Sequence, residues 1–194
     1  MAYQCTVKQG NLLNETSATF IVNASNTKML LGSGVSMAFK RHCGIELQEE
    51  MTDKFNRLDC ILKKGDVVAT SSGNAKNFKY ALHAAIMDYN QGVRGLDKLP
   101  TISDIENILI NIESYLIWYR QEKSSKNIKI VLPLLGCGVG KLNKVNIINL
   151  YKRFFSREVE FKCEVIIYGY NIKDYALLKK NLLHFQKEVW LYQK

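Results

Sequence analysis

Several stretches of the chain are short and continuously apolar, a pattern typical of buried strands. The predicted strands cover residues 19–25 (TFIVNAS), 66–72 (DVVATSS), 80–86 (YALHAAI), 128–135 (IKIVLPLL) and 164–170 (EVIIYGY). Runs without alternation are expected where both faces of a sheet are covered. Residues 3–10 (YQCTVKQG) alternate between apolar and polar positions instead, which favours a strand at the edge of the sheet.

Helical periodicity separates these strands. Residues 103–119 form one helical pattern, and Ser103 with Glu106 has the spacing of a capping box at its start. One face of this helix is apolar and consists of Ile105, Ile108, Leu109, Ile112 and Leu116. A shorter helix is predicted directly after Gly34, because the apolar residues that follow it fall on one face.

Two more helices are predicted near the end of the chain. Residues 143–155 begin at a favourable N-cap, Asn143, and their inward positions are Val145, Ile148 and Phe155. Residues 173–191 carry the apolar set Leu177, Leu178, Leu182 and Phe185. We expect residues 1–172 to form one domain and residues 173–194 to be a helix packed on it. Trp190 and Leu191 would alternatively mark a surface for a partner.

Strands and helices alternate along the chain, which predicts a three-layer α/β/α sandwich with a mixed, mostly parallel central sheet. In such a sheet, ligands bind in the crevice at the carboxyl ends of the strands. We therefore expect a ligand site at three loops, which follow residues 19–22, residues 130–135 and residues 165–167. Two of these three loops are rich in glycine.

The two glycine-rich loops have the composition of an anion site. The first is Gly32-Ser33-Gly34, and the second is Gly136-Cys137-Gly138-Val139-Gly140. Glycine lets backbone N–H groups face a ligand with no Cβ in the way, and a helix amino end adds unpaired donors and partial positive charge. Two such loops at neighbouring strand ends could hold a diphosphate from both sides. Neither loop matches a Walker motif or a GxGxxG fingerprint.

Composition and charge narrow the class of protein. The 194 residues fit one domain, and 47% of them are hydrophobic, enough for a full core. Twenty-seven basic against 18 acidic residues give a net charge of +9, which favours anionic partners, although the lysines are scattered as on a solvated surface.

The five cysteines lack CxxC spacing, which argues against a zinc site or a disulfide framework. With no apolar stretch long enough for a membrane helix and no signal-peptide pattern in MAYQCTVKQG, we expect a cytoplasmic protein.

Four motifs in order resemble the macrodomain family. They are IVNASNTKMLLGSGVSMAFKRHCG (21–44), KYALHAAIMD (79–88), IVLPLLGCGVGKL (130–142) and VIIYGY (165–170), and the resemblance spans about residues 6 to 171. Macrodomains bind ADP-ribose, and some hydrolyse ADP-ribosyl linkages or deacetylate O-acetyl-ADP-ribose. The resemblance therefore implies ADP-ribose as the ligand, with no further cofactor and no metal.

The resemblance also implies a role for each matching residue. One side of the diphosphate would be held by Gly32, Ser33, Gly34 and Val35, and the other side by Gly136, Cys137, Gly138 and Val139. Asn26 would bond the distal ribose, and Asn23 would shape the turn before it. Tyr168 would lie against the adenine, since an aromatic face suits a flat ring. The alternative for Tyr168 is an aromatic side chain at a strand end that covers the core.

The chain departs from the family pattern at three places. Macrodomains usually open with Gly-Asp-Ile, and the Asp accepts a hydrogen bond from the adenine amino group. This chain has Gly10, Asn11 and Leu12 instead. An Asn carbonyl can still accept that hydrogen bond, but without the added strength that a charged acceptor gives. Ser36 stands where hydrolytic relatives often carry an Asp; a hydroxyl can orient a water but is a poor base. Gly140 stands where relatives often carry an aromatic residue over the distal ribose, so that end is expected to be open.

Three functions remain open at this point. The first is a module that binds ADP-ribose or ADP-ribosylated protein, and the second is a hydrolase or deacetylase that uses Asn26 and Ser36 to position a water. The third, a basic nucleic-acid-binding domain, is not favoured. More ordinary assignments also exist: Asn11 and Asn26 could cap turns, and His83 fits a hydrogen-bonded core histidine. The Cys137 thiol could have a lowered pKa near a helix start. We expect a monomer that does not bind membranes.

Overall fold

A computed structural model describes residues 3–124 and 127–191 of the chain, with side chains up to residue 182. Six strands form one sheet in the order β1-β6-β5-β2-β4-β3. Their bounds are β1 Tyr3–Gln9, β2 Ala18–Asn26, β3 Val67–Ser71, β4 Phe78–Met87, β5 Ile128–Pro133 and β6 Cys163–Gly169. β3 pairs antiparallel with β4, and the other pairs are parallel. The mixed, mostly parallel sheet is thus confirmed, with β1 at its edge as the alternating pattern predicted.

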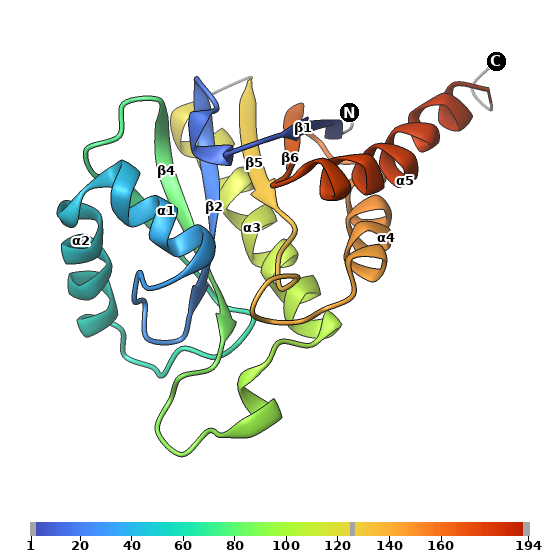
Figure 1. The fold of residues 1–194 in the computed structure, drawn as a ribbon. Coiled ribbons are helices and arrows are strands. Elements are labelled where there is room, and N and C mark those ends of the chain that lie inside the picture. The colour runs from blue at the N-terminus through green and yellow to red at the C-terminus, as the bar shows by residue number, and fades with distance from the viewer. Residues whose placement is uncertain (1–2, 125–126, 192–194) are drawn as a thin grey trace.

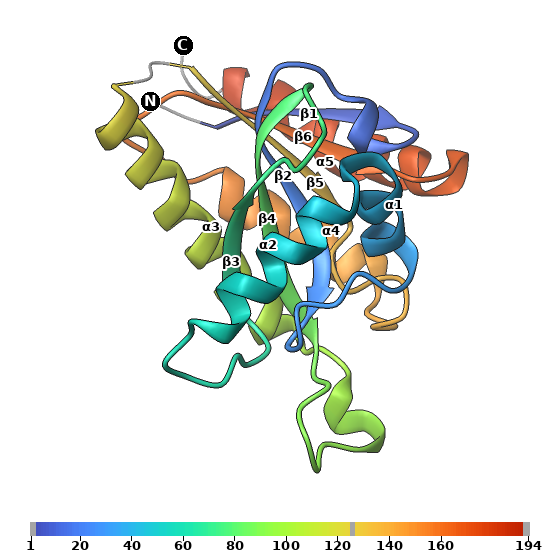
Figure 2. The same cartoon turned by 90° about the vertical axis from the view of Figure 1, so that its left-hand side faces the viewer.

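Helices cover both faces of the sheet (Figures 1 and 2), which confirms the three-layer architecture. One face carries α1 (Gly34–Cys43), α2 (Ile45–Asn56) and the short 3-10 helix η1 (Leu12–Asn14). The other face carries α3 (Ile102–Lys123), α4 (Lys144–Phe155) and α5 (Ile172–Leu191). A second 3-10 helix, η2 (Gly95–Lys98), lies in the long connection between β4 and α3. α5 continues beyond the body of the domain in Figure 1.

The central strands are apolar at consecutive positions because both of their faces are buried. Phe20 packs in the cluster beneath α3, α4 and α5, whereas its neighbour Ile21 packs in the cluster beneath α1 and α2. The same alternation repeats in β5 with Ile130 and Val131. Successive side chains of a strand point to opposite faces, so each residue of such a run contributes to one of the two cores.

The predicted helix starts are partly correct. Asn143 caps α4 by accepting hydrogen bonds from the backbone N–H groups of Val145 and Asn146, as expected. Val145 itself is 40% exposed rather than inward, because it lies in the first turn, before the helix meets the core at Ile147. α2 was not predicted, although its buried Leu47 and Met51 have helical spacing.

The predicted capping box of α3 is wrong by two residues. The helix begins at Ile102, and the box is made by Thr101 and Asp104 in place of Ser103 and Glu106. The Asp104 backbone N–H donates to Thr101 Oγ1 (3.2 Å), and the Thr101 N–H donates to Asp104 Oδ2 (2.7 Å). Both pairs have the required spacing, and the extended backbone at Thr101 decides which of them caps the helix.

α5 packs on the domain through its first half. Leu178 and Leu182 are buried in the core beneath α3 and α4, and Leu177 packs against the same cluster. The predicted inward position of Phe185, and the alternative in which Trp190 faces a partner, concern side chains outside the described residues.

The position of the α3 cap can be tested by paired alanine substitutions. We expect Thr101→Ala to lower the free energy of unfolding by about 1 kcal/mol, because one N–H of the first turn loses its acceptor. Ser103→Ala is the matched control and should change it by less than about 0.5 kcal/mol. Urea denaturation measures both, and a larger loss for Ser103→Ala than for Thr101→Ala would contradict the assignment.

Candidate functional site

Three parallel strands end at the same edge of the sheet. β2 pairs with β5, and β5 pairs with β6, so Asn26, Pro133 and Gly169 all lie at carboxyl ends along this edge. The first glycine loop follows β2, and the second follows β5. The fold therefore brings together two loops that are about a hundred residues apart in sequence.

The first glycine loop is open to solvent. Gly32, Ser33 and Gly34 are exposed, and a Cβ added to either glycine would meet no described atom within 4 Å. Gly34 has a φ of +54°, which glycine adopts without strain. Ser33 is the N-cap residue of α1 but makes no side-chain capping bond within the described structure. The first N–H groups of α1 are therefore available to an anion.

Hydrogen bonds of two residues, Leu31 and Ser36, hold this loop at its ends. The Leu31 backbone N–H donates to Gln48 Oε1 on α2 at 2.8 Å. The Ser36 hydroxyl lies within hydrogen-bond distance of Asn23 Oδ1 (3.0 Å) and of the Ala24 carbonyl (2.8 Å), both on β2. Between these anchors, the amides of residues 32–34 donate to no group in the described part of the chain. The position of the loop is thus set by the hydrogen bonds of Leu31 and Ser36, and not by hydrogen bonds from the amides of residues 32–34.

The second glycine loop is a tight turn with an open tip. The N–H groups of Lys141 and Leu142 donate to the carbonyls of Gly138 and Gly136, at 3.0 Å each. Gly136 has a φ of +74°, and an added Cβ would lie 2.6 Å from Leu142 Cδ1. The exposed tip consists of Gly138 and Val139, whose amides face no partner in the described residues.

Gly140 is required by the packing of its own turn. It is buried, and an added Cβ would lie 2.5 Å from the Gly136 carbonyl oxygen and 2.7 Å from Pro100 Cγ. The close approach of the Gly136 main chain and the Pro100 ring therefore explains why this position has no side chain. That the distal ribose end of the site is open stays a prediction.

Ser36 and Asn26 are used within the fold. Ser36 is 3% exposed, and the two acceptors on β2 hold its hydroxyl away from the open loop. Asn26 closes the turn after β2: its Oδ1 accepts from the N–H groups of Lys28 and Leu30, and its Nδ2 donates to the Leu30 carbonyl at 2.8 Å. These contacts match the turn-capping alternative for Asn26 and show that the Ser36 hydroxyl joins α1 to β2.

Asn11 and Leu12 lie beside the end of β6. The Gly10 N–H donates to the Gly169 carbonyl at 3.0 Å, which continues the pairing of β1 with β6. Asn11 is exposed, and its Oδ1 accepts from the Leu13 N–H at 3.1 Å, so it caps η1. Leu12 is buried in the core beneath α1. The side chain that can reach a ligand here is that of Asn11.

Two tyrosines mark the end of β6. Tyr168 is 8% exposed in the α1-side core, and its hydroxyl donates to Glu15 Oε2 at 2.9 Å, which matches the core-covering alternative. Burial, together with the Glu15 carboxylate, raises the pKa of Tyr168. Tyr170 lies just beyond the strand and is 81% exposed. The sequence analysis missed Tyr170, although its place two residues after Tyr168 puts it on the same side of the chain.

The Cys137 thiol is protonated at neutral pH. Burial raises its pKa to about 11, while the charge of Lys144 lowers it in part and that of Asp174 raises it. The suggestion that a helix start lowers this pKa is therefore wrong, since burial outweighs it. In the portion of the chain that the structure describes, no cluster of three His, Cys, Asp or Glu side chains could hold a metal ion. None of the described helices is long and apolar enough to cross a membrane.

A chain of buried polar groups lies beneath the first loop. Asn23 Nδ2 is 3.0 Å from His83 Nδ1, and His83 Nε2 is 2.8 Å from Thr70 Oγ1. An amide NH₂ can only donate, so His83 Nδ1 must accept, and the proton of the neutral ring is on Nε2. Burial lowers the pKa of His83 to about 3, with a smaller contribution from Lys54. His83 is thus a hydrogen-bonded core histidine, as the sequence analysis suggested for it.

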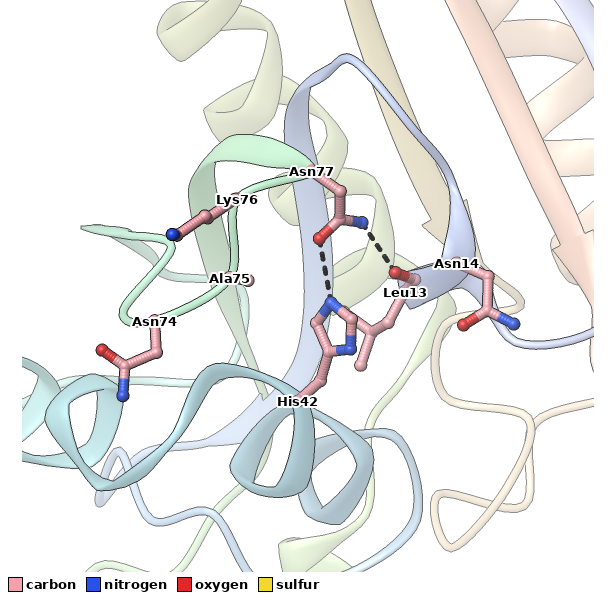
Figure 3. A pocket seen from close by; sticks show the side chains of 7 residues that line it. All are labelled: Leu13, Asn14, His42, Asn74, Ala75, Lys76 and Asn77. Carbon is pink, nitrogen blue, oxygen red and sulfur yellow. Dashed lines mark hydrogen bonds between the residues drawn. The ribbon is translucent and has the colours of Figure 1, made fainter.

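A hollow elsewhere on the domain lies at the other end of the sheet (Figure 3). It has a volume of about 530 Å³ and lies between η1, the end of α1 and residues 74–77, next to the start of β4. In it, Asn77 Oδ1 is 2.9 Å from His42 Nε2, and Asn77 Nδ2 donates to the Leu13 carbonyl at 2.8 Å. Neither glycine loop borders this hollow.

Comparisons with known proteins identify related chains. A family model described as Macro domain matches residues 22–149. An uncharacterized protein of Sulfolobus acidocaldarius is 36% identical over 89 residues, which are 46% of this chain and 47% of that protein. The match thus spans about half the length of that relative.

Solved structures show the same fold. A variant of the Oceanobacillus iheyensis macrodomain determined with ADPR has a TM-score of 0.72 at 20% identity, with 94% of each chain covered. The Trypanosoma brucei macrodomain in complex with ADP-ribose has a TM-score of 0.68 at 15% identity, covering 91% of this chain and 68% of that one.

The buried His83 predicts a pH dependence of stability. Below about pH 6.5 the unfolded chain protonates this histidine, whereas the native ring stays neutral down to a pKa of about 3. The contribution of His83 is therefore complete above pH 6.5 and is lost as the pH falls toward 3. Between pH 7 and pH 5 we expect it to fall by about 2 kcal/mol.

Urea unfolding at a series of pH values measures this effect. His83→Gln should flatten the slope between pH 7 and pH 5 relative to the parent protein, because the titrating group is gone. His42→Gln is the matched control, since the His42 ring is exposed. An unchanged slope in His83→Gln would contradict the assignment of a neutral buried ring.

Proposed function

The chain belongs to the macrodomain family, and we propose that it binds ADP-ribose along the sheet edge where β6, β5 and β2 end. The observation that carries this proposal is the amino end of α1, which has no side-chain cap and includes the open residues Ser33 and Gly34, at the end of a strand that pairs with β5. Backbone amides at a helix start bind phosphate groups through their N–H donors and the helix dipole. By contrast, the amino end of α4 is filled by its own Asn143.

The two loops would hold the diphosphate from both sides. Gly32, Ser33, Gly34 and Val35 would supply amides from α1, and Gly138 with Val139 would supply them from the second loop. The remaining predicted residues of that loop, Gly136, Cys137 and Gly140, would support its shape. A net charge of +9 adds a general attraction for an anionic ligand.

The adenine would lie at the β6 end of this edge. Tyr170 offers an exposed aromatic face there, and Asn11 offers a carbonyl that caps η1 with one lone pair and has a second one free. The buried Tyr168 would support this end from below. Since Asn11 is neutral, its bond to the adenine amino group would be weaker than that of a carboxylate.

Binding rather than hydrolysis is the activity that the geometry supports. Of the residues considered for catalysis, Ser36 is anchored to β2, Asn26 holds its own turn, and the Cys137 thiol is protonated. Residues 32–34 and the tip at Gly138 and Val139 offer backbone amides without a partner in the described residues, and such amides bind phosphate but do not remove protons. Recognition of free ADP-ribose or of an ADP-ribosylated protein is therefore the proposed role, in the cytoplasm.

A charge placed in the first loop should abolish binding. We expect ADP-ribose to raise the melting temperature of the parent protein and to have no effect on Gly34→Glu, whose carboxylate would occupy the diphosphate site. Gly92→Glu is the matched control, because Gly92 also has a positive φ and open space around it. A thermal shift in Gly34→Glu equal to that of the parent protein would remove the proposed site.

Incubation with substrates separates binding from catalysis. We expect mono-ADP-ribosylated protein and O-acetyl-ADP-ribose to remain intact, with no more product than in an Asn26→Ala control, because Ser36 and Asn26 are engaged in hydrogen bonds within the fold. Mass spectrometry measures any release of ADP-ribose. Turnover by the parent protein above that control would establish a hydrolase instead.

A further inference from the structure

The first glycine loop depends on its anchors for its position. Residues 32–34 are exposed and donate no hydrogen bond in the described part of the chain, so little within the loop fixes where its amides point. Gln48 holds the loop before Gly32, and Ser36 holds α1 after Gly34. Of these two anchors, only Ser36 lies on the helix whose amino end would face the ligand.

The Ser36 anchor is the first member of a relay across four elements. Ser36 on α1 is 3.0 Å from Asn23 on β2, Asn23 is 3.0 Å from His83 on β4, and His83 is 2.8 Å from Thr70 on β3. Thr70 Oγ1 in turn donates to the Ser71 carbonyl at 2.8 Å. These four residues are at most 3% exposed.

The relay has a consistent direction of donation. Thr70 gives its proton to the Ser71 carbonyl, so it accepts from His83 Nε2–H, and His83 Nδ1 accepts from the Asn23 amide. Asn23 Oδ1 can then accept from Ser36, whose single hydroxyl proton is shared between this oxygen (3.0 Å) and the Ala24 carbonyl (2.8 Å), both on β2. Either bond ties α1 to β2, and removing Thr70 or Asn23 leaves a buried group of the relay unpaired.

We propose that His83 is a positioning residue for the diphosphate loop and acts through Asn23 and Ser36 to hold the amino end of α1 against β2. This inference rests on the proposed binding of ADP-ribose. Apolar side chains would fill the space between these strands without the cost of burying an imidazole. Hydrogen bonds, unlike apolar contacts, fix direction, and the direction of the α1 amides is what a phosphate requires.

Variants at the two ends of the relay test this role. We expect Ser36→Ala and Thr70→Val each to weaken ADP-ribose binding about fivefold to tenfold, although Thr70 lies two strands away from the first glycine loop. Adenosine, which lacks the diphosphate, should bind the parent protein and both variants equally within about twofold. Isothermal titration measures ADP-ribose, and ligand-observed NMR measures adenosine.

Two further variants separate positioning from stability. Ser36→Thr keeps the hydroxyl and should restore most of the affinity. Asn77→Ala removes two partly buried hydrogen bonds at the opposite end of the sheet (Figure 3) and should lower the melting temperature without changing the affinity. The double variant Ser36→Ala/Thr70→Val should bind ADP-ribose about as well as Ser36→Ala alone. Both substitutions interrupt the same relay, so their effects on affinity should not add.

The outcomes distinguish this inference from the proposed function. If the parent protein does not bind ADP-ribose, the proposed function fails and the relay has no ligand to position. If the parent protein binds and both relay variants keep its affinity while melting earlier, the relay is structural and the inference is overturned. Equal losses for ADP-ribose and adenosine, or an equal loss in Asn77→Ala, would also overturn it.

Discussion

Parallel pairing of the central strands is the constraint on which this structure depends. Each parallel neighbour must be reached by a crossover on one face of the sheet, so β2, β5 and β6 finish at a common edge. This arrangement alone brings the loop at Gly32 next to the loop at Gly138. The helices that make the crossovers bury both faces of the sheet. At the edge where the strands end, the amides of residues 32–34 and of Gly138 and Val139 have no partner in the described residues.

Side chains at this edge are largely occupied with the chain itself. Asn11 caps η1, Asn26 closes a turn, and Ser36 ties α1 to the sheet. What the edge presents outward is mostly main chain, with Tyr170 as an aromatic exception. A surface of this kind recognises phosphate geometry and a flat ring, and it offers little acid–base chemistry.

Much of this could be predicted from the sequence, because buried strands and glycine turns depend on local composition. Continuous apolar runs located the central strands, and the two glycine loops followed from their place after strands. The sequence left two roles open for Asn26, ribose binding and turn capping, and it did not predict that Ser36 joins α1 to β2. These roles depend on the exact form of a turn and on a partner on another strand, which local composition does not determine. Tyr170 was missed for a related reason. β6 ends at Gly169, so Tyr170 lies just outside the strand and is exposed, and the sequence does not show where the strand ends.

The contact between Gly140 and Pro100 joins the second loop to the start of α3. A Cβ at position 140 would collide first with the Gly136 carbonyl oxygen, at 2.5 Å, and then with the proline ring, at 2.7 Å. Because the nearer atom belongs to the main chain, a smaller residue in place of Pro100 would not make room for a side chain at position 140. Homologous chains that carry a large residue there must therefore fold this turn along another path.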